Sequence, residues 1–95
     1  MYLLEDELRE EKGFRGPGKF DLMVAFLEPE RNVVRVSLDD GPQICFGITE
    51  LRRKDPYGRE FYFRGELKLG SGCILPVAGE FQVYGPGKIK IVESS

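Results

Sequence analysis

The sequence predicts an all-β fold, a small six-stranded antiparallel barrel or sandwich with meander connections and a short N-terminal helix. Clusters of Gly, Pro, Asn and Asp recur at short spacing, at residues 16–18, 28–32, 39–42, 55–58, 70–72 and 85–87. The segments between them have strand length and are rich in β-branched and aromatic residues. No connection is long enough for a crossover helix, so neighbouring strands are expected to run antiparallel.

The N-terminal segment, residues 1–12, is predicted to be an acidic helix or tail. Leu4 and Leu8 are four residues apart, as on one face of a helix, and Gly13 ends the pattern. The leucines of this segment would otherwise face water, which favours a helix docked on the barrel. A single domain is expected over residues 1–95, with the barrel at 14–93.

The expected strands are residues 19–27, 33–38, 43–53, 59–69, 73–84 and 88–93. The fifth strand is expected to be interrupted at Pro76 or Gly79, because proline lacks a backbone donor and glycine weakens a strand. The tetrapeptide Gly-Pro-Gly-Lys precedes the first and last strands, at 16–19 and 85–88. Proline followed by glycine suits a type II turn, so each copy predicts a chain reversal.

The longest hairpin turns at residues 55–58, where Asp-Pro-Tyr-Gly suits a three-residue loop that ends on a left-handed glycine. This turn pairs Arg52 with Tyr62 and Glu50 with Arg64, so opposite charges face each other.

Burial of apolar side chains at the base of the same hairpin predicts a register shifted by one residue, with Phe46 opposite Leu67. One face then holds Ile44, Phe46, Ile48, Phe61, Phe63, Leu67 and Leu69. We expect a second bulge, at Gly65 or Gly47, to reconcile the two registers.

The formal net charge of −2 argues against binding to nucleic acid or anionic membranes through total charge. No apolar run approaches the length of a membrane span, and the N-terminus lacks the basic and apolar regions of a secretory signal. Unless a signal has been removed, a cytoplasmic protein is expected.

The two cysteines, Cys45 and Cys73, are too few for a four-ligand Cys/His zinc site in a chain without histidine. Each lies beside apolar residues, so we expect two buried free thiols rather than a disulfide. No cofactor is expected.

Catalytic chemistry has little support in the sequence. The lack of histidine removes the usual general base and any Ser-His or Cys-His pair. Asp39 and Asp40 are adjacent in a turn, where aspartate is favoured for local backbone hydrogen bonds. Ser71 and Cys73 have no identifiable activating partner. We therefore expect a protein that is not an enzyme.

Basic and aromatic side chains gather in the hairpin of residues 52–64. The candidate binding residues are Arg52, Arg53, Lys54, Tyr57, Arg59, Tyr62 and Arg64. Such a mixture can pair with phosphates while its rings stack on bases, and tyrosine and arginine also dominate protein interfaces. Acids interleaved at 50, 55, 60 and 66 leave a third interpretation, a solvated arm whose charges cancel.

The expected function is a small non-enzymatic binding module that contacts a protein partner through this hairpin. Self-association through a strand edge is one form of that interaction. Binding of single-stranded nucleic acid through the same hairpin is the alternative, which the net charge disfavours. No membrane partner is expected.

Arg31 and Arg35 resemble the Arg-x-x-x-Arg motif of cyclic-di-GMP-binding PilZ domains, which are six-stranded barrels of this size. The family's second motif, Asp/Asn-x-Ser-x-x-Gly, is not met by residues 35–41. That segment has one residue too many before its glycine, and Arg35 occupies the acidic position. The chain is therefore not assigned to the family.

Overall fold

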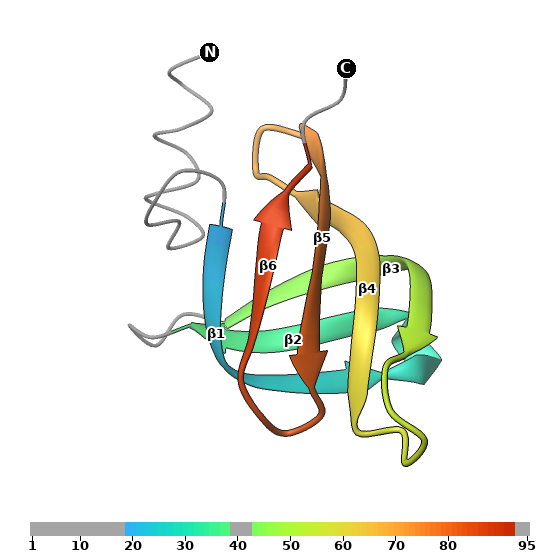
Figure 1. Cartoon of the computed structure of the whole chain (residues 1–95). Coiled ribbons are helices and arrows are strands. Elements are labelled where there is room, and N and C mark those ends of the chain that lie inside the picture. The colour runs from blue at the N-terminus through green and yellow to red at the C-terminus, as the bar shows by residue number, and fades with distance from the viewer. Residues whose placement is uncertain (1–18, 39–42, 93–95) are drawn as a thin grey trace.

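The computed structural model describes residues 19–38 and 43–92, which form a closed antiparallel barrel (Figure 1). Its strands are β1 (Lys19–Glu28), β2 (Val33–Leu38), β3 (Gln43–Arg53), β4 (Glu60–Lys68), β5 (Ile74–Gln82) and β6 (Gly87–Ile91). A single 3-10 turn, η1 (Pro29–Arg31), connects β1 to β2. The predicted all-β meander is confirmed, as a barrel rather than a sandwich. The helix predicted at 1–12 lies outside the described residues.

The barrel closes through β1, which is long enough to pair with two strands. Residues 19–22 pair with β6, and residues 22–28 pair with β2. The register with β2 shifts between Leu22 and Val24, an irregularity that lets a strand bend from one partner toward the next.

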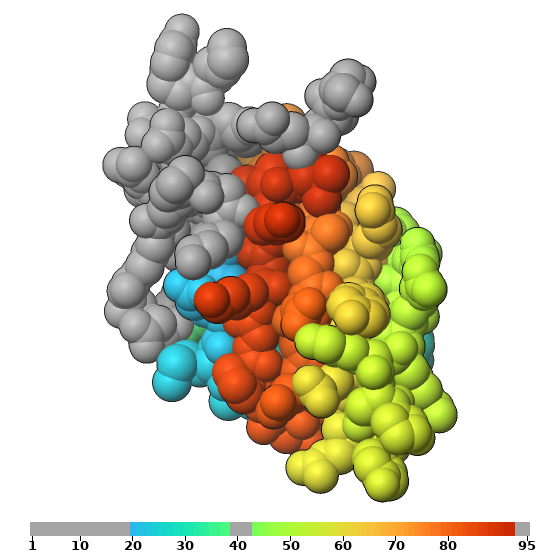
Figure 2. Space-filling view, in the orientation of Figure 1, coloured from blue at the N-terminus to red at the C-terminus, as the bar shows by residue number. Residues whose placement is uncertain are grey.

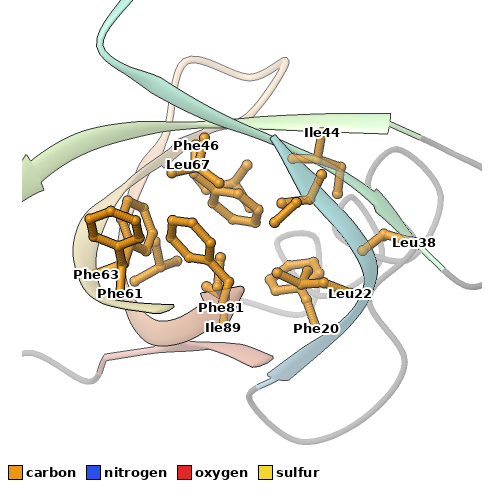
Figure 3. Packing of buried hydrophobic residues seen from close by; sticks show 14 of the residues in the cluster. Phe20, Leu22, Leu38, Ile44, Phe46, Phe61, Phe63, Leu67, Phe81 and Ile89 are labelled. Carbon is orange, nitrogen blue, oxygen red and sulfur yellow. The ribbon is translucent and has the colours of Figure 1, made fainter. Parts of the chain in front are cut away.

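The interior of the barrel is filled by apolar side chains that alternate along the strands. On β4, Phe61 and Phe63 are buried, whereas Tyr62 and Arg64 between and beside them face solvent. Figure 3 shows the core residues converging from all sides of the sheet. Each fully buried side chain of this size contributes about 1.5–3 kcal/mol to stability, so the core is the main source of stability.

The β3–β4 hairpin contains both predicted registers. Near the tip Arg52 pairs with Tyr62, as the turn predicts, and toward the base Ile48 pairs with Gly65, as burial predicts. The predicted inward-facing residues of this hairpin are buried, apart from a half-buried Ile48.

The bulge that separates the two registers has Thr49 as its extra residue, because the register shifts between Ile48 and Glu50. The predicted bulge is therefore present, but neither Gly65 nor Gly47 is the inserted residue. A Cβ on Gly65 would lie 2.0 Å from the Gly47 carbonyl oxygen, so this glycine permits close approach of the strands beside the bulge.

β5 runs without interruption through Pro76 and Gly79, contrary to prediction. The Pro76 carbonyl accepts a hydrogen bond from Val92 N on the β6 side, so the missing proline donor also faces that side and the pairing with β4 is intact. A Cβ on Gly79 would lie 2.0 Å from the Lys88 carbonyl oxygen. The glycine permits the close approach of β6 rather than breaking the strand.

The two turn predictions have different outcomes. Gly58 has a φ of 72°, the left-handed conformation predicted for the hairpin tip. At the second Gly-Pro-Gly-Lys copy, positive φ is found not at Gly87 but at Tyr84, the residue before the copy, at 59°. The chain reverses earlier than predicted, since Gly85 N donates to the Gln82 carbonyl, so the type II assignment is wrong there. Residues 16–18 of the first copy lie outside the described residues.

Both cysteines are free, as predicted, but they are exposed rather than buried. Cys45 lies between Ile44 and Phe46, which point into the barrel, so the alternation of the strand turns its side chain outward. Apolar neighbours in the sequence therefore do not indicate burial within a strand.

Candidate binding surface

The outer side of β3 and β4 brings together four of the seven predicted binding residues. Arg52 and Tyr62 are direct cross-strand partners, and Arg64 follows two residues later on the same side of β4. Lys54 follows the end of β3, and its Nζ lies 5.5 Å from the Tyr62 ring centroid. Tyr62 is 48% exposed, so a half-exposed ring lies within a basic surface.

Lys54 also connects this hairpin to β5. Its Nζ donates to Glu80 Oε1 at 2.5 Å, and Glu80 is the cross-strand partner of Tyr62. The hydrogen bond to Glu80 raises the pKa of Lys54. The contact holds the Lys54 ammonium near the tyrosine ring and engages the Glu80 carboxylate.

The remaining predicted residues lie at the hairpin tip, apart from that surface: Arg53, Tyr57 and Arg59. Asp55 Oδ1 holds the turn by accepting hydrogen bonds from Arg59 N and Glu60 N, each at 2.9 Å. The bond from Glu60 is the largest cause of the lowered pKa of Asp55. A Cβ on Gly58 would lie 3.7 Å from Arg53 Cζ, so the Arg53 guanidinium packs over the turn.

β6 extends the surface with two lysines that the sequence prediction missed. Lys88 is the cross-strand partner of Glu80, and Lys90 is the partner of Ala78. Ile89 between the lysines is fully buried, so both lysines point outward. The alternation Lys-Ile-Lys-Ile at 88–91 could have identified them, but only once β6 was known to lie two strands from Arg64.

We call the combined surface the basic face, defined by Arg52, Lys54, Tyr62, Arg64, Lys88 and Lys90. It lies on the outer side of the strands that face the viewer in Figure 2, coloured from yellow-green through orange to red.

Two shallow hollows lie on the basic face. The smaller, of about 330 Å³, is lined by Glu50, Arg52, Tyr62, Phe63, Arg64, Ala78 and Gly79. The larger, of about 520 Å³, has among its lining residues Lys54, Gly79, Glu80, Lys88 and Lys90. Gly79 borders both hollows, so they meet on β5.

Positive charge on the basic face is only partly neutralised. Within residues 19–38 and 43–92, Arg64, Lys88 and Lys90 form no ion pair. Glu50 is the cross-strand partner of Arg64, but its carboxylate lies within 3.9 Å of Arg52 instead. Three cations are therefore available to an anionic partner.

The outer side of β1 and β2 differs, because its arginines are engaged within the fold. Arg31 Nη1 lies 3.0 Å from Glu28 Oε1, and Arg35 Nε donates to the other oxygen at 2.5 Å. The bond from Arg35 is the largest cause of the lowered pKa of Glu28, followed by that from Arg31. The Arg35 guanidinium also lies 4.7 Å from the Phe26 ring centroid. The two arginines with PilZ-like spacing thus have partners on their own surface.

Other classes of site find no support in the part of the chain that the structure describes. Among those residues, no three His, Cys, Asp or Glu side chains are grouped as metal ligands would be. None of its helices has the length and apolar character of a membrane span. The adjacent carboxyl groups of Asp39 and Asp40 lie outside the described residues.

Comparison with known proteins identifies no relative, since no family model, curated protein or solved structure matches the chain. Function must therefore be inferred from the chain's own residues.

Proposed function

We propose that the chain is a small non-enzymatic binding module that contacts a protein partner through the basic face and the adjoining hairpin tip. The observation that carries this proposal is Tyr62, a half-exposed ring opposite Arg52 and near Lys54. Tyrosine and arginine side chains at the centre of a surface supply much of the binding free energy in protein interfaces. A closed barrel holds them in place before binding, which lowers the entropy lost on association.

The charge pattern favours a protein over a nucleic acid. Glu50 and Glu80 lie on the same side of the sheet as the cations, as cross-strand partners of Arg64 and Tyr62. A protein surface can complement both signs of charge, whereas a phosphate backbone is repelled by carboxylates.

Self-association through a strand edge is a less favoured form of this function. Ile48 is the last β3 residue bonded on the β2 side, where its N and O both contact Asn32. Beyond it, residues 50–53 pair with β4 alone in the described sheet. The bulge at Thr49 and the charges that follow disfavour pairing of this short edge with a second copy.

Site-specific photocrosslinking tests the proposal. A benzophenone amino acid replaces Tyr62 in one variant and, as a control, Tyr84 in another. Tyr84 is 75% exposed and contacts Phe26, away from the basic face. We expect a protein adduct at position 62 that is absent at 84 and is lost when Arg64→Glu is added. The adduct is then identified by mass spectrometry and its binding measured with purified partner. Equal adducts at both positions, or an adduct insensitive to Arg64→Glu, would contradict the proposal.

Single-stranded nucleic acid is the second candidate, supported by Arg64, Lys88 and Lys90, which form no ion pair with any residue that the structure describes. Fluorescence anisotropy of a labelled mixed-sequence oligonucleotide, at low and physiological salt, separates the two functions. Binding that weakens steeply with salt and is lost in Arg64→Glu would favour nucleic acid. No binding at low salt would remove this candidate.

A further inference from the structure

The centre of the basic face is a gap between two cations. Arg64, Ala78 and Lys90 are direct neighbours on β4, β5 and β6. Neighbouring strands lie about 4.8 Å apart, so the backbones of Arg64 and Lys90 are about 10 Å apart with only a methyl side chain between them. Both long side chains can reach an anionic group above Ala78.

A third cation, Lys88, lies next to this gap, two residues before Lys90 on the same side of β6. Lys88 lies beside Glu80 in register, but the Glu80 carboxylate is bonded to Lys54. Lys88 itself forms no ion pair within the described residues. The internal pair of Lys54 and Glu80 therefore leaves the positive charge of Lys88 to an incoming ligand.

The surface between these cations is also hollowed. The hollow that contains Arg64 and the hollow that contains Lys90 meet at Gly79, so the depression crosses β5. The small residues Ala78 and Gly79 line the smaller hollow together with Tyr62. An elongated ligand can therefore lie across the strands with an apolar group against Ala78.

We propose that the partner docks an extended acidic peptide segment in this depression, an inference that rests on the proposed function of the basic face. In an extended chain every second side chain faces the same way, and the chain rises about 3.3 Å per residue. Carboxylates four residues apart, with an apolar side chain midway, therefore all face the depression and span about 13 Å, which the long side chains of Arg64 and Lys90 can reach from backbones about 10 Å apart. One such carboxylate faces Arg64, and another faces Lys88 and Lys90. An apolar side chain between them packs on Ala78 beside Tyr62.

A polynucleotide fits the same surface less well. Single-strand binding uses several rings on which successive bases stack. Along the described outer side of β3 to β6, Tyr62 is the one aromatic side chain, because Phe61 and Phe63 point into the core. A peptide can place an uncharged residue beside Glu50, which borders the smaller hollow, whereas a nucleic-acid backbone carries a negative charge at every phosphate.

Fluorescence anisotropy with defined peptides tests the inference on the full chain. The probe is a fluorescein-labelled peptide of Asp, Glu and Phe, and the matched control replaces the acids with Asn and Gln. The site variant is Arg64→Glu with Lys90→Glu. The charge-matched control is Arg31→Glu with Lys68→Glu, two exposed cations that border neither hollow and lie outside both the basic face and the hairpin tip. Circular dichroism checks that both variants are folded.

We expect the acidic peptide to bind and the amide peptide not to bind. The site variant should weaken binding of the acidic peptide at least tenfold, and the control variant less than twofold. Equal weakening in both variants would show a general charge effect and overturn the inference, as would absence of peptide binding at low salt. Binding of the mixed-sequence oligonucleotide in place of the peptide would also overturn it, in favour of nucleic acid.

The crosslinking experiment tests the proposed function separately from the acidic peptide segment. A protein adduct at position 62 without binding of the acidic peptide keeps the proposed function and overturns the acidic segment. Absence of both overturns both.

Discussion

The two outer sides of the barrel differ in whether an arginine is bonded within the fold. On the β1–β2 side, Arg35 is bonded to Glu28 and lies over the Phe26 ring. On the basic face, Arg64 has no ion-pair partner among the described residues, and its neighbour on β5 is Ala78. Arginine on one side serves to organise a surface, and on the other it is available for binding.

Cross-strand register explains the difference, because it decides which side chains meet. Arg35 has Phe26 and Cys45 as its cross-strand neighbours, and Glu28 lies two residues beyond Phe26 on the same side of β1. A carboxylate and a ring can therefore surround one guanidinium. Arg64 has Glu50 on one side, but that carboxylate lies closer to Arg52.

The largest loss of stability is expected from a change in the core, because both outer sides of the barrel pack on it. Phe46→Ala removes a fully buried ring that contacts Phe20 and Phe63. It should lower the free energy of unfolding by about 3–5 kcal/mol and disturb both outer sides. Urea unfolding measures this loss. The adjacent exposed change Cys45→Ala should stay within about 0.5 kcal/mol, and a similar loss there would contradict the inward and outward assignment.

A smaller loss of stability is expected from a substitution beneath the basic face, at Gly79. Gly79→Ala places a methyl group 2.0 Å from the Lys88 carbonyl oxygen, so β6 must move away from β5. Overpacking of this kind typically lowers stability by about 1–3 kcal/mol. Gly47→Ala is the matched control, because its nearest contact would be 3.9 Å away. Thermal and urea unfolding of the two variants compare them, and equal stabilities would contradict the close approach.

The two arginines themselves provide the direct comparison. Arg35→Ala loses the ring contact and the bond to Glu28, and should lower the free energy of unfolding by about 0.5–1 kcal/mol. Arg64→Ala should change stability by less than about 0.5 kcal/mol while it weakens partner binding. Urea unfolding tests the first statement, and the crosslinking assay tests the second. A larger stability loss for Arg64→Ala would mean that Arg64 has a structural role.

The smallest effects are expected in the pH dependence of stability. One is expected at acidic pH and the other at alkaline pH. The pKa of Glu28 is lowered from its ordinary value of 4.5, so its stabilising contribution is present above that value and is lost as pH falls through the folded pKa. The pKa of Lys54 is raised from 10.5, so its contribution is present below that value and is lost as pH rises through the folded pKa.

Thermal unfolding across pH, with Glu28→Gln and Lys54→Met, separates these contributions. Glu28→Gln should reduce the loss of stability on acidification and leave the alkaline side unchanged, and Lys54→Met should do the reverse. Asp55, whose pKa is also lowered, continues to contribute on the acid side in both variants. Parallel curves for all three proteins would contradict the assignment of these pairs.

Much of the fold could be predicted because local signals agree along the chain. The bounds of the six strands agree with those expected to within two residues, since Gly, Pro and Asp clusters end each apolar run. Two predictions, an interruption of the fifth strand at Pro76 and the burial of Cys45, were wrong for the same reason. Both depend on the direction a residue faces in the sheet, and local composition does not report that direction.

Part of the candidate site could also be predicted from the sequence. Arg52, Tyr62 and Arg64 are neighbours within one hairpin, so the turn at 55–58 determines how they align. The separation of Arg53 from that group was not evident, because the bulge at Thr49 changes which β3 side chains face outward.

Local patterns of residues were enough to predict the class of fold, the strand order along the chain and the alternation that makes one side of each strand apolar. Closure of the meander, and the position of Lys88 and Lys90 beside Ala78 and Glu80, followed only from the pairing of strands in three dimensions. The two kinds of feature differ because they depend on contacts at different distances along the chain. A turn and a pattern of period two act between near neighbours, whereas a surface that spans three strands depends on how the whole sheet pairs and twists.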